Sequence, residues 1–209
     1  MTLVRTAKPV KKEATKFSAM DYRLLLALAL LLPCLFLLAG FTSHFIPSES
    51  MFPTLTPGDH IVTMKSWMAY PFGASPKRGD IIVFHLDDSK VPVADSKAGA
   101  GAESDTLIKR VIGLPNETIE IEGNNIYING GKIIESHDYV LDSPKFKNTY
   151  VYAVGKPYKI PPDQYFVLGD NRLTSFDSRY WGCVPREDII GRFARVLYHS
   201  GGSAPAPAK

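Results

Sequence analysis

IEIEGNNIYI, residues 119–128, alternates isoleucine with other residues on both sides of a Gly-Asn-Asn turn. Alternation with a period of two is typical of half-buried β-strands, and a turn rich in glycine and asparagine between two such runs is typical of a hairpin. This stretch therefore predicts an antiparallel β-hairpin, followed by a second turn at residues 129–131.

The sequence on either side of this hairpin repeats the pattern of short apolar runs separated by turns. We predict further strands at residues 61–64, 80–84, 106–112, 165–168 and 191–198. Only short helices fit between them, for instance near residues 185–189. The predicted fold class is therefore mainly β, with an antiparallel, coiled or barrel-like β domain after one N-terminal transmembrane helix.

The transmembrane helix is predicted from a long apolar run. Residues 24–43 contain no charged side chain, and Pro33 lies in the middle of these 20 residues. A helix of that length is about 30 Å long, which matches the hydrocarbon core of a bilayer, and membrane helices tolerate proline. We expect a retained transmembrane anchor. The alternatives are a cleaved signal peptide, whose apolar core is normally shorter, and a buried helix.

Positive charge is concentrated before this run. Residues 1–23 hold six bases and two acids, a net charge of +4, whereas the whole chain of 209 residues has a net charge of +3. A basic tail predicts a cytoplasmic N-terminus, with the rest of the chain across the membrane. The remaining residues sum to −1, so the sequence does not indicate a surface that binds nucleic acid.

The two cysteines place limits on the chemistry of the chain. Cys34 falls in the apolar run and Cys183 in the β-rich part, so we do not expect them to pair. A disulfide scaffold is therefore excluded, and no Cys/His pair has the spacing of zinc ligands.

The apolar run is followed closely by a serine-containing segment. IPSESMFPTL, residues 46–55, holds Ser48 and Ser50 between Pro47 and Pro53. In an extended chain, residues two apart point to the same side. We therefore expect the two hydroxyls to meet near a membrane surface, where a nucleophile could act on a membrane-bound substrate.

A serine nucleophile needs a base, and Lys109 is the candidate on local grounds. None of the five histidines sits in a recognisable triad motif. In the predicted strand at residues 106–112, alternation places Lys109 on one face with Leu107 and Val111. Apolar neighbours remove water from the amine and lower its pKa. The alternative is a lysine whose charged head reaches the solvent.

Two other segments stand out. GDNRLTSFDSRYWG, residues 169–182, follows a strong predicted strand and is rich in hydroxyls, acids and arginines. It is either a surface turn or an ordered, partly buried polar network. Trp67, Met68, Tyr70 and Phe72 form an aromatic-rich patch that suits either a membrane interface or ordinary core packing.

Taken in order, the serine segment, residues 78–84, the lysine segment at residues 108–115 and the loop at residues 169–182 resemble the type I signal peptidase family. Members of this family are membrane proteases that remove signal peptides with a serine–lysine pair. The resemblance covers about residues 44–198 and the anchor. It implies a mostly antiparallel β domain that needs no metal, nucleotide or other cofactor.

The resemblance also assigns roles to individual residues. It implies that Ser50 is the nucleophile and that neutral Lys109 is the general base. The Ser50 backbone N–H and the Ser48 hydroxyl match the oxyanion hole. Ser175 matches the serine that orients the lysine, while Asp177 and Arg179 match a supporting ion pair.

The predicted domain organisation combines the resemblance with the charge, hydropathy and low-complexity segments of the chain. Residues 1–23 are a basic cytoplasmic tail, 24–43 the transmembrane anchor, 44–199 an extracytoplasmic peptidase domain with a flexible loop at 87–105, and 200–209 a disordered tail. Two departures from the family pattern are a glutamate, Glu49, where many members have glycine, and the length of the 87–105 loop. Glu49 should point away from the face that Ser48 and Ser50 share.

The implied substrates are preproteins whose signal peptides have small residues at positions −1 and −3, bound as an extended strand. The lipid bilayer and the secretion translocon are the other expected partners, and a bacterial inner (plasma) membrane is the expected location. A thylakoid or mitochondrial inner membrane stays an alternative location. The alternative functions are a specialised maturase of the same family, for pilin or conjugation subunits, and a non-catalytic anchored β domain that binds exported chains.

Overall fold

A computed structural model describes residues 19–86, 106–134 and 150–199 of the chain. The predictions for most of the basic tail, for the 87–105 loop and for the 200–209 tail lie outside the described residues. The chain divides into two compact units, Met1–Ala39 and Gly40–Lys209, and each is described by itself.

The first unit contains the helix α1, Ala19–Ala39, which includes Pro33. Its stretch Tyr22–Ala39 is long and apolar enough to cross a membrane, with a mean hydropathy of 2.3 and none of its residues buried. The apolar helix is therefore present, but the predicted boundary at residue 43 is wrong. The helix ends at Ala39, and Phe41–Phe45 form a strand, β1, because they pair with β2.

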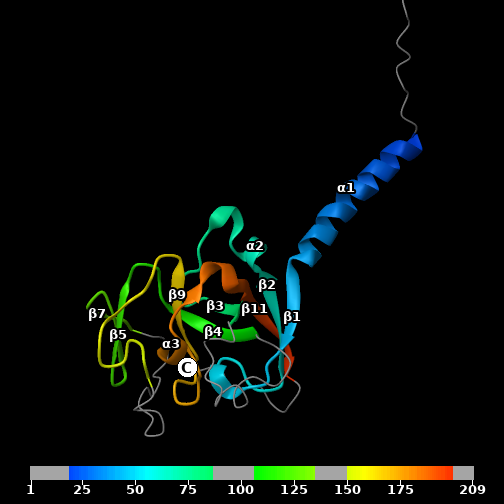
Figure 1. The fold of residues 1–209 in the computed structure, drawn as a ribbon. Helices are drawn as coiled ribbons and strands as arrows, with labels where there is room; N and C mark the ends of the chain where they lie inside the picture. The colour runs from blue at the N-terminus through cyan, green and yellow to red at the C-terminus, as the bar shows by residue number, and fades with distance from the viewer. Residues whose placement is uncertain (1–18, 87–105, 135–149, 200–209) are drawn as a thin grey trace, which may run out of the picture. The chain divides into compact units, whose positions relative to one another are not determined.

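The second unit is built from two antiparallel sheets (Figure 1). The larger has the order β1-β2-β11-β3-β4-β9-β10, and the smaller has the order β7-β6-β5-β8. The predicted mainly antiparallel β fold is confirmed. The strands not yet given are β2 Asp59–Lys65, β3 Ile81–His85, β4 Thr106–Gly113, β5 Thr118–Glu122, β6 Asn125–Ile128, β7 Gly131–Lys132, β8 Tyr158–Lys159, β9 Gln164–Leu168, β10 Val184–Pro185 and β11 Ile189–His199.

The helical elements of this unit are short. They are α2 Ser66–Ala69 and α3 Ser178–Trp181, with 3₁₀ turns η1 Glu49–Met51, η2 Pro71–Gly73 and η4 Arg186–Asp188. The turn η4 lies where the sequence predicted a short helix. The elements that the sequence did not predict are either very short, such as β8, β10 and α3, or overlap the end of the predicted membrane run, as β1 does.

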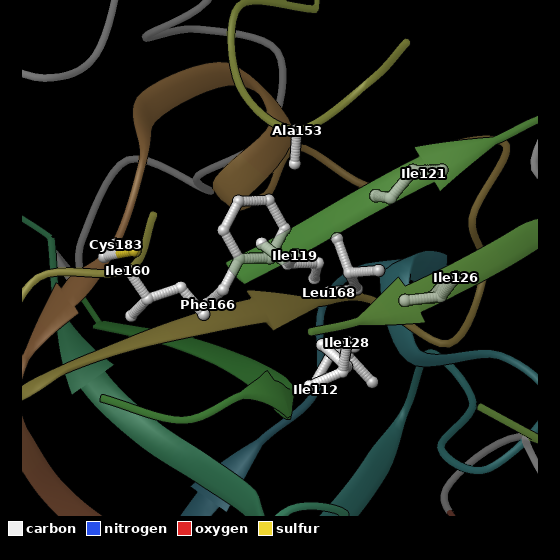
Figure 2. Close-up of a cluster of buried hydrophobic side chains, with 10 residues drawn as sticks. All are labelled: Ile112, Ile119, Ile121, Ile126, Ile128, Ala153, Ile160, Phe166, Leu168 and Cys183. Carbon is white, nitrogen blue, oxygen red and sulfur yellow. The ribbon is translucent and has the colours of Figure 1, made fainter. Parts of the chain in front are cut away.

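The hairpin predicted at residues 119–128 is formed by β5 and β6. Ile119 pairs with Ile128 and Ile121 with Ile126, and Gly123 takes the positive φ of 54° that the turn requires. All four isoleucines are buried. Figure 2 shows them facing Phe166 and Leu168 of β9, together with Ile112, Ala153, Ile160 and Cys183.

Two further clusters complete the core of the second unit. One joins β3, β4 and β9 to α3 and includes Ile82, Phe84, Val111, Val167 and Trp181. The other packs beneath the serine segment and consists of Ile46, Met51, Leu55, Ile61 and Ile81. These clusters hold β4 and the serine segment in place, and the candidate site is built on these two parts of the chain.

Candidate active site

The serine segment is a tight turn rather than an extended strand. Ser48 has an extended backbone, with φ −124° and ψ 159°, but Glu49, Ser50 and Met51 form the 3₁₀ turn η1. The turn buries Met51 in the cluster beneath the segment. The predicted local conformation is therefore wrong, yet the expected meeting of hydroxyls occurs, because Ser48 Oγ donates to Ser50 Oγ at 3.3 Å.

Glu49 lies between the two serines and is exposed, while Ser50 is buried. The backbone oxygen of Glu49 accepts a hydrogen bond from Phe52 N–H at 3.0 Å, which closes the turn. The exposure of Glu49 agrees with the prediction that its side chain points away from the two hydroxyls, and that direction stays a prediction.

Lys109 reaches Ser50 from β4. Its Nζ lies 2.9 Å from Ser50 Oγ and 2.9 Å from the backbone oxygen of Ile108. The side chain is only 3% exposed, and its neighbours on the strand, Leu107 and Val111, belong to the adjoining apolar cluster. The structure thus brings together the two residues that the sequence placed 59 positions apart.

The electrostatics of this pair favour a neutral amine. Burial lowers the pKa of Lys109 from 10.5 to about 8, although the negative charges of Asp177 and Asp170 oppose the shift. Desolvation dominates because an ammonium group loses its hydration shell inside the protein. Above that pH the nitrogen has a lone pair that can accept the proton of Ser50.

The loop after β9 contains Asp177, one of the two acids whose charge acts on Lys109. Asp177 caps α3 and binds Arg179 through two contacts, Oδ1 to Nε at 2.8 Å and Oδ2 to Nη2 at 2.9 Å. Burial raises the pKa of Asp177, but the Arg179 charge and the hydrogen bonds from Arg179 and from Gly169 N–H together outweigh this effect, so the pKa is lowered. Asp177 also accepts a hydrogen bond from Gly169 N–H at 3.1 Å. The loop is therefore an ordered, buried network.

Ser175 is buried in the same loop. Its hydroxyl makes no hydrogen bond to any group in the described part of the chain. The expected hydrogen bond from Ser175 to Lys109 is therefore not formed in this structure. Gly169 lies between Ser175 and the Ser50 carbonyl, and a Cβ at Gly169 would overlap both groups.

Residues 19–198 match the family model described as "Signal peptidase, peptidase S26". The chain belongs to this family.

Individual relatives agree with this assignment. A signal peptidase I of Leptolyngbya laminosa is 42% identical over 150 residues, which are 72% of this chain and 65% of the relative. A probable signal peptidase I-2 of Synechocystis is 40% identical over 150 residues, 72% of this chain and 60% of the relative. The signal peptidase I of Bacillus amyloliquefaciens is 33% identical over 194 residues, which are 91% of this chain and 90% of the relative. The chain thus matches less than two thirds of the first two relatives' length.

Sequence reasoning missed one polar network beside the site. Arg110 binds the buried carboxylate of Asp170 through two contacts, at 2.7 Å and 2.6 Å, and Thr54 donates to the same carboxylate at 2.5 Å. Asn171 N–H, next in the chain, donates to the Ser50 carbonyl at 3.0 Å. The only local signal was the alternation that places Arg110 on the face opposite Lys109.

Within residues 19–86, 106–134 and 150–199, no three His, Cys, Asp or Glu side chains are grouped closely enough to hold a metal ion.

Proposed function

We propose that this protein is a membrane-anchored serine endopeptidase that removes N-terminal signal peptides from exported preproteins. The observation that carries the proposal is the 2.9 Å contact between Ser50 Oγ and the buried Nζ of Lys109. A serine hydroxyl is a weak nucleophile until a nearby base removes its proton, and a buried lysine is such a base when it is neutral. The names of the relatives supply the substrate class.

The proposed reaction uses Ser50 and Lys109 both to form an acyl-enzyme and to hydrolyse it. Ser50 Oγ attacks the scissile carbonyl carbon as its proton passes to Lys109 Nζ. The resulting ammonium then protonates the leaving amine, and an acyl-enzyme on Ser50 remains. A water molecule, deprotonated by the neutral Lys109, attacks the ester and frees Ser50.

The remaining site residues are proposed to support this reaction. The Ser50 N–H and the Ser48 hydroxyl would stabilise the negative oxygen of the tetrahedral intermediate, and Ser48 Oγ is 3.3 Å from Ser50 Oγ. Asp177 and Arg179 would hold the loop that carries Ser175 against the lysine, without contact to the substrate.

The membrane setting is part of the same proposal. The apolar helix α1 would span the inner (plasma) membrane of a bacterium, with the N-terminus in the cytoplasm and the β-rich unit outside it. The substrates would carry small residues at positions −1 and −3, and the secretion translocon would deliver them. Support comes from the exposed apolar surface of α1 and from the names of the relatives.

Cleavage of a preprotein by the full-length, detergent-solubilised protein tests the proposal. We expect cleavage after a small residue, and a loss of about a thousandfold or more in Ser50→Ala and in Lys109→Ala. Ser43→Ala and Lys132→Ala, which change exposed residues outside the site, should keep full activity. Retained cleavage in either site variant, or none by the folded wild type, would refute the serine–lysine peptidase.

A further inference from the structure

Phe52 is an exposed aromatic side chain close to the candidate nucleophile. It follows Ser50 by two residues and is 46% exposed, whereas Met51 and Leu55 of the same segment are completely buried. Its N–H donates to the Glu49 carbonyl at 3.0 Å and so closes the turn η1. The ring does not belong to the apolar cluster beneath the serine segment. The backbone of Phe52 therefore has a structural role, but core packing does not explain its side chain.

The residues on both sides of Phe52 contact the same loop, which is the loop after β9. The Ser50 carbonyl accepts a hydrogen bond from Asn171 N–H at 3.0 Å, and Thr54 Oγ1 donates to the Asp170 carboxylate at 2.5 Å. Phe52 lies midway along the chain between these two contacts. The backbone of Phe52 therefore runs beside residues 170 and 171, at one edge of the candidate site.

Asn171 supplies a polar side chain at this edge. It is half-buried, whereas Asp170 and Arg172, which flank it, are each only 1% exposed. A carboxamide both donates and accepts hydrogen bonds, so it can bind the backbone of an extended peptide. An aromatic ring with a few placed polar groups is the usual lining of a binding site.

The proposed mechanism indicates which part of a substrate reaches this edge. The ammonium of Lys109 protonates the leaving amine, so the nitrogen of residue +1, the first residue after the scissile bond, must approach Lys109 Nζ. The loop after β9 lies against both reacting groups. Arg110, the neighbour of Lys109, binds Asp170 at 2.7 Å and 2.6 Å, and Asn171 binds the Ser50 carbonyl. The chain that begins at residue +1 should therefore leave along this loop.

We propose that Phe52 and Asn171 form the subsite for the first residues of the mature chain. The Phe52 ring contacts an apolar side chain at position +1 or +2, and the Asn171 carboxamide hydrogen-bonds the peptide backbone there. This inference rests on the proposed function. It adds a preference on the mature side of the scissile bond to the expected preference for small residues at positions −1 and −3.

Paired preproteins test the role of the ring. One pair differs only by leucine or serine at +1, and a second pair differs in the same way at +2. We expect the full-length wild type in detergent to favour leucine in one pair by roughly threefold to tenfold in kcat/KM, because contact with the ring removes leucine surface from water. Phe52→Ser should cleave both members of that pair equally.

Phe72→Ser is the matched control for this ratio. It makes the same change at a fully exposed phenylalanine on η2, so the preference for leucine should stay at the wild-type value. A wild type without preference in either pair, or an unchanged preference in Phe52→Ser, would overturn the role of Phe52.

A peptide ester separates binding of the mature chain from support of the fold. A methyl ester of the signal-peptide segment has the same acyl part as a preprotein but no residue after the scissile bond. Asn171→Ala keeps the backbone N–H that binds Ser50, and it should lose about fivefold in kcat/KM on every preprotein, because one hydrogen bond to the substrate is missing. Both Asn171→Ala and Phe52→Ser should hydrolyse the ester as the wild type does. An equal loss on ester and preprotein would overturn the subsite.

Failure of the subsite differs from failure of the proposed function. A folded wild type that hydrolyses neither preprotein nor ester refutes the peptidase and, with it, this inference. Cleavage that is the same in the wild type, Phe52→Ser and Asn171→Ala for all substrates refutes the subsite alone.

Discussion

The burial of Lys109 lowers the stability of the fold, and the same burial serves the proposed function because it lowers the pKa of the amine. The unfolded chain keeps the lysine proton up to about pH 10.5, whereas the folded protein releases it near pH 8. Between these values the unfolded state binds more protons, so the free energy of unfolding rises with pH. Below about pH 8 both states are protonated, and the full cost of the buried charge is present.

The activity should follow this titration. Below about pH 8 the amine of Lys109 is protonated and cannot accept the Ser50 proton, so kcat/KM should rise roughly tenfold per pH unit up to that value and then level off. Lys109→Arg should be inactive at every pH because a guanidinium stays charged. A profile flat from pH 6 to 10 with chemistry rate-limiting, or an active arginine variant, would exclude Lys109 as the base.

The same charge should limit stability. At pH 7 we expect Lys109→Met to raise the free energy of unfolding by up to about 3 kcal/mol, since a shift of one pKa unit corresponds to about 1.4 kcal/mol. The gain should shrink between pH 8 and 10.5, as the wild-type amine loses its proton in the folded state. Denaturant unfolding of the wild type and of Lys109→Met in detergent measures this gain. Lys132→Met, at an exposed lysine, is the control and should show no such trend.

At the scale of elements, the loop after β9 packs tightly against the serine segment. A Cβ on Gly169 would overlap Ser175 Oγ and the Ser50 carbonyl. Gly169→Ala should therefore displace the Ser50 backbone and reduce kcat/KM by tenfold or more, at a cost of about 1–3 kcal/mol in stability. In Gly131→Ala the new Cβ meets only the Ile128 oxygen at 3.5 Å, so this control should match the wild type. Full activity in Gly169→Ala would contradict the close approach.

The Asp177–Arg179 pair should matter mainly for stability. Both side chains are almost completely buried, and removal of one partner leaves an uncompensated charge that costs about 3–5 kcal/mol. We expect Arg179→Met to lower the free energy of unfolding by that amount, as measured by denaturant unfolding. The double variant Asp177→Asn with Arg179→Met should recover part of this loss in stability. A double variant that is clearly less stable than Arg179→Met alone would show that the two residues do not act as a pair.

Elements with a strong local pattern were predictable. Residues 119–128 form the β5–β6 hairpin as expected, because alternation of isoleucines and a glycine turn are local signals. The serine segment was predicted as extended but forms the turn η1, because burial of Met51 is a tertiary effect. The Asp170 network could not be predicted, since Arg110 and Thr54 are 60 and 116 residues away from that carboxylate.

At the scale of the whole molecule, the hydrophobic clusters of the described residues lie in the second unit. The three apolar clusters consist of residues between Ile46 and Val196, and in the described part of the chain none of them includes a residue of α1. The large apolar side chains of α1 are exposed instead. A compact unit with its own hydrophobic core can in principle fold alone.

The unit Gly40–Lys209 should therefore fold without α1. We expect the truncated protein to unfold at the same temperature as the full-length protein in the same detergent. It should cleave a soluble signal-peptide substrate with the same pH profile, because Ser50 and Lys109 lie in this unit. Cleavage of a preprotein in vesicles should fall, since the proposed anchor that concentrates enzyme at the membrane is missing. An unfolded truncated protein would show instead that α1 contributes to the fold itself.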